Sequence, residues 1–293
     1  MSKPESQVAL LREDADYFRE VVRFTAQVTT FAPRLVEKDY LCTVLLEYLA
    51  ATGSKLVFKG GTCLSKVHAN FYRLSEDLDF VIPMPADSPR SKRSKHAAVI
   101  NKAVAALPER FPFFQVIQPL KGANNSTHYN AVIGYAPLAG SEENTIKIEI
   151  GLREPLLLST LDGLARTILL DPNSDKPLIP PLVVSCISKM EAFAEKFRAA
   201  LSRREAAVRD FFDLDYAVRR LGLRPENPDL IELVRRKLAV PGNEPVNVSA
   251  SRLAALRQQV GPQLQPVLRA EDFAEFDLER AFRAVATMAV RVA

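Results

Sequence analysis

The chain has 293 residues, of which 47% are hydrophobic and 25% charged, and its formal net charge is +4. This composition is that of an ordinary globular protein, and the length suits one large domain or two moderate ones. The mild positive charge permits nucleic-acid binding without arguing for it. The sequence contains no stretch with the length and apolarity of a signal peptide or a membrane-spanning helix, so we expect a cytoplasmic protein with no membrane segment.

Cysteine and histidine are rare in this chain. The cysteines are Cys42, Cys63 and Cys186, and the histidines are His68, His96 and His128. The cysteines are odd in number and lack paired spacing, so the sequence supports neither a disulfide framework nor a zinc site. We interpret the scattered histidines as surface or satisfied core residues.

Two helices are expected at the start of the chain, at about Val8–Val28 and Arg34–Ala51, from the spacing of their apolar residues. The second is apolar on most sides, but its first turn contains Glu37 and Asp39. Acidic residues at this position have two interpretations, a functional one and a simple complement to the helix dipole.

A paired glycine, Gly60-Gly61, separates a short apolar strand from a predicted helical segment at Thr62–Phe71. Glycines before a helix start let backbone amides approach an anion closely, and the helix dipole favours negative charge there. The turn therefore indicates a phosphate site.

A second strand carries Asp77 and Asp79, whose side chains point to the same face because they are two residues apart. Leu78 and Phe80 point the other way, into a core. Two carboxylates on one face repel each other unless a cation lies between them, so the pair suggests an oxygen-liganded divalent metal such as Mg²⁺. A phosphate turn beside a metal site is suited to a nucleoside triphosphate.

The sequence pattern between Ser88 and Gly151 predicts a basic helix and three strands. The run Ser88–Lys95 (SPRSKRSK) leads into a helical pattern and is either a solvated face or a contact for a polyanion. Phe113–Leu120 and His128–Ala136 look like a β-hairpin. Asn144–Gly151 alternates strictly and places Glu149 on its polar face, either beside the aspartate strand or simply paired with Lys147.

The composition changes after about Leu170, where a proline-rich segment resembles a linker. Beyond it the pattern is almost entirely helical, and we expect domains at 1–175 and 176–293. The expected helices are Val184–Leu201, Val208–Leu221, Asp229–Leu238, Ser251–Leu268 and Glu271–Val292.

Two polar features interrupt the helical half. Lys189 lies at an apolar helix start, and Asp210 and Asp213 are three apart, on one side of a helix. Taken in isolation, such an aspartate pair would by default lie on an exposed helix face, with its negative charge balanced by nearby arginines.

The order of these pieces resembles that of polymerase-β-like nucleotidyltransferases. More narrowly, the chain resembles the AbiEii-like nucleotidyltransferase toxins of AbiE-type (type IV) toxin–antitoxin and phage-defence systems. The residues that carry the resemblance are Glu37–Tyr40 (EKDY), Phe58–Lys66 (FKGGTCLSK), Arg73–Phe80 (RLSEDLDF), Glu149 in IKIEI, Lys189 in SKMEA and Arg209–Leu214 (RDFFDL). They span about residues 35 to 220. The resemblance implies a bilobed α+β (α/β) protein, in which a nucleotidyltransferase core with a mixed sheet precedes a helical C-terminal lobe.

The resemblance also implies residue roles. Asp77, Asp79 and Glu149 would hold Mg²⁺ and form the catalytic carboxylates; Gly60, Gly61 and Thr62 would hold the β- and γ-phosphates; Lys189 would neutralise phosphate charge; and Asp210 and Asp213 would complete the cleft. Such a division suits nucleotidyl transfer, which depends mainly on positioning and charge stabilisation.

The implied reaction transfers NMP from an NTP to an RNA acceptor, with the tRNA 3′ end as the leading candidate. The expected effect is a block of translation and growth, neutralised by an antitoxin encoded nearby. The basic residues of Arg90–Lys95 and Lys196–Arg204 are expected to bind the RNA backbone. Two alternatives stay open, nucleotidylation of a protein side chain and a non-catalytic nucleotide- or RNA-binding module. Ser75 lies close to the predicted metal ligands, so its phosphorylation is expected to close the site by charge repulsion.

Overall fold

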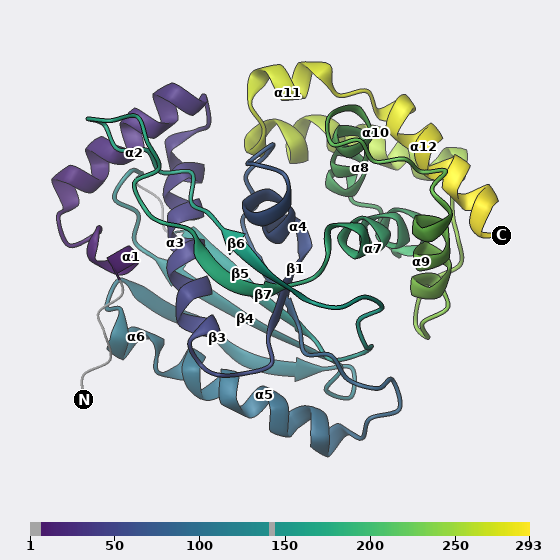
Figure 1. Ribbon diagram of the computed structural model, residues 1–293, viewed down its shortest axis with the longest axis horizontal. Helices are drawn as coiled ribbons and strands as arrows, with labels where there is room; N and C mark the ends of the chain where they lie inside the picture. The colour runs from purple at the N-terminus through teal and green to yellow at the C-terminus, as the bar shows by residue number, and fades with distance from the viewer. Residues whose placement is uncertain (1–6, 141–143) are drawn as a thin grey trace. The chain divides into compact units, whose positions relative to one another are not determined.

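The computed structural model describes residues 7–140 and 144–293 (Figure 1). They form two compact units. The first takes the chain up to Leu156 and then Thr160–Ile187, and the second takes Leu157–Ser159 and Ser188–Ala293. The first unit contains a mixed sheet with helices, and the second is helical. The predicted fold class, an α+β core with a mixed sheet followed by helices, is confirmed.

In the described part of the first unit, the sheet has seven strands in the order β3-β4-β5-β2-β1-β7-β6. The strands are β1 (Val57–Lys59), β2 (Leu78–Val81), β3 (Phe114–Ala123), β4 (His128–Tyr135), β5 (Asn144–Gly151), β6 (Leu161–Ala165) and β7 (Leu182–Cys186). β2 runs parallel to β5 and antiparallel to β1, while β1 runs parallel to β7. The predicted hairpin is confirmed as the antiparallel pair β3 and β4, and the predicted strand Asn144–Gly151 is confirmed as β5.

Within residues 7–140 and 144–187, seven helical segments belong to the first unit. They are α1 (Gln7–Leu10), α2 (Ala15–Thr29), α3 (Pro33–Ala50), α4 (Gly60–Cys63), the π-helix η1 (Leu64–His68), α5 (Arg90–Ala105) and α6 (Leu107–Arg110). The single helix expected over Val8–Val28 is thus two, because Asp14 caps α2 by accepting from the amide of Tyr17. α3 crosses the sheet beside α2 (Figure 1) and is buried on almost every side, as its apolar sequence predicts.

The core of the sheet follows the alternation of its strands. Ile146, Ile148 and Ile150 of β5 are fully buried, and Leu78 and Phe80 of β2 lie beside them. The polar residues between them point to the opposite face. This alternation gives the sheet one apolar face and one face that carries carboxylates.

The segment before the helical unit differs from the prediction. A helix was expected over Val184–Leu201, but its first three residues belong to β7 (Leu182–Cys186), with Val183 exposed and Val184 buried in strand alternation. The helix begins only after Ser188, whose hydroxyl accepts from the amide of Glu191. Because β7 pairs with β1, the first unit extends to Ile187 rather than to residue 175.

The second unit consists of helices that pack around α7. They are α7 (Lys189–Ser202), α8 (Val208–Arg220), α9 (Pro228–Leu238), α10 (Ala250–Gln259), the π-helix η2 (Val260–Leu264), the 3₁₀ helix η3 (Gln265–Val267), α11 (Ala270–Glu275) and α12 (Leu278–Val292). α7 contacts α8, α9 and α12. None of the helices in the described ranges is both long and apolar enough to cross a membrane.

Two of the expected C-terminal helices are divided in the structure. Ser251–Leu268 is α10 followed by η2 and η3, and Glu271–Val292 is α11 followed by α12. The second division has a local cause, because Asp277 caps α12 by accepting from the amide of Arg280.

Candidate active site

The centre of the candidate site is a pair of carboxylates on neighbouring parallel strands. Asp79 of β2 lies in register with Glu149 of β5, so both side chains leave the same face of the sheet. Both residues are half-buried. The expectation that the Glu149 strand lies beside the aspartate strand is confirmed.

Asp77 joins this pair from just outside the strand. β2 begins at Leu78, so Asp77 precedes it rather than forming part of it. The Oδ1 atom of Asp77 accepts a hydrogen bond of 3.1 Å from the backbone amide of Lys147 on β5, which holds the carboxylate near that strand. On the other side, the hydroxyl of Thr62 donates to the backbone carbonyl of Asp77.

The Gly60-Gly61 turn lies directly against the Asp79 side chain. Gly60 has a φ of +75°, and a Cβ atom there would lie 2.1 Å from Oδ2 of Asp79. Only glycine combines this left-handed backbone with so close an approach. The first amides of a helix have no acceptor within it, so the amides that begin α4 are available to an anion beside the carboxylates. The Thr62 hydroxyl, by contrast, is buried and its proton is used on Asp77.

A lysine ammonium lies among the carboxylates. Lys147 Nζ forms a salt bridge with Oε1 of Glu149. The hydrogen bond that Lys147 donates to Glu149, together with the negative charges of Glu149, Asp77 and Asp79, raises the pKa of Lys147. The three carboxylates therefore all favour the charged form of this lysine, and their expected role as metal ligands stays a prediction. The alternative interpretation, in which Glu149 is paired with Lys147, also describes a real contact.

Sequence reasoning missed His128, which was interpreted as a scattered surface or core histidine. Its Nε2 atom lies 3.6 Å from Oε2 of Glu149, because β4 pairs antiparallel with β5. Burial lowers the pKa of His128, and the positive charges of Lys147 and Lys59 lower it further, against the opposing effect of Glu149. The cross-strand register could not be read from the sequence.

The acidic residues of the EKDY motif have structural contacts. Glu37 accepts from the amides of Leu138 and Ala139 at 2.7 and 2.9 Å. Asp39 forms an ion pair of 2.7 Å with Lys66, in which neither side chain is more than 2% exposed. Asp39 comes from the EKDY motif and Lys66 from the FKGGTCLSK motif. The two motifs thus each contribute one residue to this buried ion pair.

Lys189, Asp210 and Asp213 belong to the second unit. Lys189 is the first residue of α7 and is half-buried. Lys196 of α7 lies 2.7 Å from a carboxylate oxygen of both Asp210 and Asp213 on α8. The Asp213 side chain is fully buried, and that of Asp210 nearly so. These contacts indicate that the two aspartates hold α7 against α8, and their expected role at the nucleotide stays a prediction.

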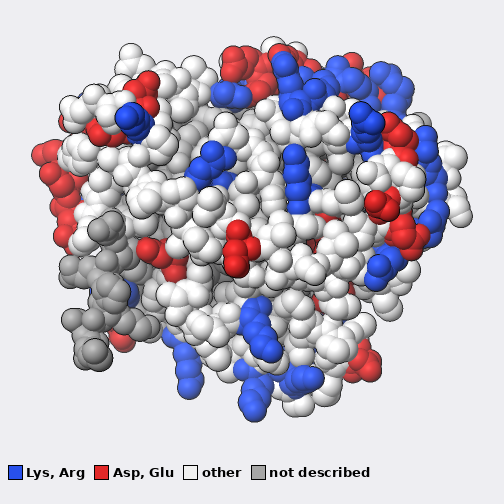
Figure 2. Space-filling model, viewed as in Figure 1, with Lys and Arg blue, Asp and Glu red and all other residues white. Residues whose placement is uncertain are grey.

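The two basic segments differ from what their sequences suggest. In the first, Arg90, Lys92 and Lys95 are exposed, and Figure 2 shows cationic side chains along the edge formed by α5. Arg93 is instead buried and donates to the carbonyl of Ala86 at 2.9 Å. In the second segment, Lys196 is used by the aspartates of α8. Only part of the expected polyanion contact is therefore available.

A mixed sheet that presents three carboxylates beside a glycine turn fits the expectation of a nucleotidyltransferase. The family model described as nucleotidyl transferase AbiEii toxin, type IV TA system, matches residues 44–288. The chain therefore belongs to the AbiEii family of nucleotidyltransferase toxins. Membership in this family implies a nucleotide substrate and a cognate antitoxin.

A solved structure shares the fold, and a second shows a weaker similarity. JHP933 from Helicobacter pylori is 17% identical, with 89% of this chain and 93% of that chain covered and a TM-score of 0.52. MenT4, a nucleotidyltransferase toxin from Mycobacterium tuberculosis H37Rv, is 20% identical, with 93% and 98% covered and a TM-score of 0.48. No curated protein sequence matches the chain.

Proposed function

We propose that the protein is an Mg²⁺-dependent nucleotidyltransferase that transfers NMP from an NTP to an RNA acceptor, the 3′ end of a tRNA, and thereby blocks translation and growth. The observation that carries this proposal is the register of Asp79 with Glu149, with Asp77 bonded to the same strand as Glu149. Three carboxylates on one sheet face complement the positive charge of a metal ion. The available amides of the neighbouring turn complement the negative charge of the phosphates that the metal carries.

The residues present fit a magnesium ion. All the donors are carboxylate oxygens, which Mg²⁺ prefers, and the cluster already attracts the ammonium of Lys147. Asp77, Asp79 and Glu149 would hold the ion. When bound, Mg²⁺ supplies charge neutralisation at the triphosphate and favours deprotonation of the acceptor hydroxyl.

The chain's own groups orient the reactants. The amides of the Gly60-Gly61 turn bind the β- and γ-phosphates, while Thr62 fixes the backbone of Asp77. Glu149 would act as the base toward the acceptor hydroxyl, and Nε2 of His128 lies 3.6 Å from its second oxygen. The role expected of Lys189, neutralising the charge of the phosphates, rests on the family resemblance alone.

An RNA acceptor is supported by the exposed cations of α5, namely Arg90, Lys92 and Lys95. They follow the carboxylate strand closely in the chain. The choice of tRNA rests on the family resemblance.

The proposal is tested by incubating the protein with each labelled NTP, Mg²⁺ and total RNA, with a parallel incubation in which protein replaces the RNA. We expect one NTP to label an RNA of tRNA size, and the Asp77→Ala variant to reduce the label by about 10²-fold or more. Label in protein alone would show nucleotidylation of a side chain instead. If no fraction is labelled and Asp77→Ala keeps its toxicity in cells, the protein is a binding module and the proposal is wrong.

A negative charge at Ser75 is expected to inhibit the transfer. The Ser75 hydroxyl lies 3.1 Å from the place that a Cβ of Gly61 would occupy, so it borders the phosphate turn. Like charges a few ångström apart repel by a few kcal/mol near a protein surface, so Ser75→Asp should lower the initial rate by about tenfold or more. Ser75→Ala is the matched control and should keep the rate. Full activity of Ser75→Asp would show that charge at this position does not regulate the site.

A further inference from the structure

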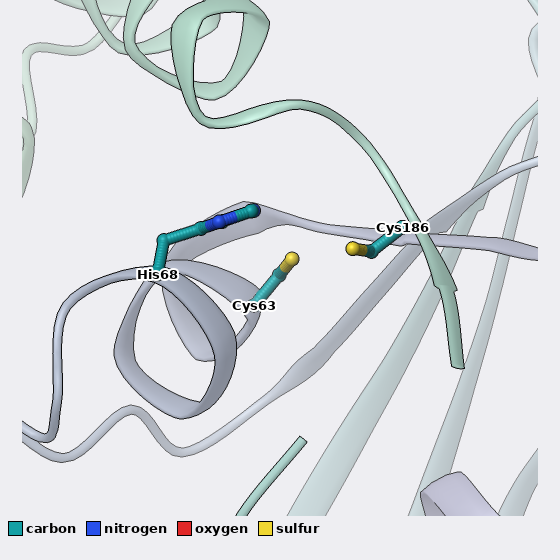
Figure 3. Close-up of side chains that lie close together, drawn as sticks. All are labelled: Cys63, His68 and Cys186. Atoms are coloured by element: carbon teal, nitrogen blue, oxygen red, sulfur yellow. The ribbon is translucent and has the colours of Figure 1, made fainter. Parts of the chain in front are cut away.

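Two cysteines and a histidine that are distant in the sequence meet in the first unit (Figure 3). The sulfur atoms of Cys63 and Cys186 and a ring nitrogen of His68 all lie within 4.8 Å of one another. Both cysteines are buried, and His68 is half-buried. The expectation that these residues are scattered is therefore wrong for this trio, in which Cys186 is too far from Cys63 and His68 in the sequence for the spacing to indicate a site.

The fold builds this cluster from three elements. Cys63 ends α4 and His68 ends η1, and the i→i+5 bonding of a π-helix brings residues five apart to one side. Cys186 ends β7, which pairs with β1 immediately before the glycine turn. On the neighbouring strand β6, Gly163 leaves room for the sulfur, because a Cβ atom there would lie 2.5 Å from Sγ of Cys186.

We propose that Cys63, His68 and Cys186 form a binding site for a thiophilic metal ion, with Zn²⁺ as the ion that this donor set favours. Two thiolates and an imidazole are typical zinc ligands, and a water completes four-coordination. With Zn–S bonds of about 2.3 Å, tetrahedral geometry places two sulfurs about 3.8 Å apart. The observed separations of at most 4.8 Å allow this with shifts of about 1 Å.

The surroundings of His68 fit the role of a ligand. Its Nε2 atom lies 3.0 Å from the backbone carbonyl of Ile187. With Nε2–H donating to this carbonyl, the lone pair of Nδ1 is left to bind a metal. Metal-binding histidines usually have such a partner, which fixes the ring and its tautomer.

This site is distinct from the carboxylate cluster in both donors and purpose. The carboxylates offer hard oxygen ligands that suit Mg²⁺, whereas the sulfur and nitrogen donors suit Zn²⁺. A metal held by Cys63, His68 and Cys186 would tie the helical segment that follows the Gly60-Gly61 turn to strand β7. Its expected role is therefore to fix the phosphate turn on the sheet, and its binding does not depend on the reaction that the protein catalyses.

The test is a titration of Zn²⁺ into the full-length protein after its thiols have been reduced and its metals removed with a chelator. Competition with a chromophoric chelator should show one tightly bound equivalent per chain. Cys63→Ser and Cys186→Ser should each weaken this binding by about 10²-fold or more, because each removes a ligand. Cys42→Ser is the matched control, since Cys42 is buried elsewhere, on α3, and should leave the affinity unchanged.

A second measurement needs no variant of the cluster. Bound Zn²⁺ should protect Cys63 and Cys186 of the wild type from alkylation, as read by mass spectrometry, and should raise the Tm. Asp77→Ala should keep the bound equivalent, which excludes binding at the carboxylates. If the reduced wild type takes up no stoichiometric zinc, or if both serine variants still bind it, the proposal is wrong. Formation of a Cys63–Cys186 disulfide in a protein that binds no zinc would likewise overturn it.

Discussion

Replacing Gly60 with alanine is expected to lower nucleotidyl transfer by about 10³-fold. The new Cβ would lie 2.1 Å from Oδ2 of Asp79 and 2.7 Å from its Cβ, so the whole carboxylate side chain must move. Misplacing a catalytic group by about 1 Å costs about 10²-fold in rate. The turn must shift as well, and the loss of one well-aimed phosphate contact accounts for about another tenfold. The measurement is the initial rate with labelled NTP and RNA.

A second glycine provides the matched control for this variant. Gly53 has a φ of +67°, close to the +75° of Gly60, but a Cβ atom there would meet no atom within 4 Å. Both alanine variants carry the left-handed backbone penalty of about 1–2 kcal/mol. A rate loss found in Gly60→Ala and absent from Gly53→Ala therefore reports the displaced carboxylate rather than general destabilisation. Equal rates in the two variants would show that Asp79 has no role in the reaction.

The sequence was sufficient to predict the part of the site that depends on strand periodicity. Glu149 could be placed on the polar face of its strand because three isoleucines alternate with polar residues, and β5 has the predicted bounds. Asp77 and Asp79 were expected to share a face with it, and β2 does pair with β5. The alternation of apolar and polar residues within a strand depends only on neighbouring residues, so it can be predicted from the sequence alone.

The residues whose roles were missed are those that depend on partners distant in the sequence. Asp39 and Lys196 look like surface charges in their own helices, yet each forms an ion pair with a different element. The meeting of Cys63 with Cys186 likewise depends on β7, which the sequence led us to assign to a helix. The burial of a charge or a thiol is decided by which elements pack together, and helical or strand spacing does not contain that information.

Removing the carboxylate of Asp39 is expected to destabilise the first unit strongly. Lys66 is fully buried, and its ammonium lies 2.7 Å from Oδ1 of Asp39, 2.8 Å from the hydroxyl of Thr43 and 3.2 Å from the carbonyl of Arg166. Asp39→Ala leaves this charge without its counterion. Breaking a buried pair from one side costs about 3–5 kcal/mol. For a domain of this size, the Tm should fall by roughly 6–20 °C.

We attribute this large effect to the burial of the Asp39–Lys66 pair and not to the short distance between its charged atoms. Two further variants distinguish these two explanations. Asp16 and Arg19 form an exposed pair with the same separation of 2.7 Å, so Asp16→Ala should leave the Tm within experimental error. In the double variant Asp39→Ala/Lys66→Met the buried charge is gone as well, and its Tm should be no lower than that of Asp39→Ala alone. A double variant whose two losses simply add would show that the pair is not coupled. The ammonium of Lys66 would then be stabilised mainly by its other acceptors, and the thermal melt of Lys66→Met alone would show how much they contribute.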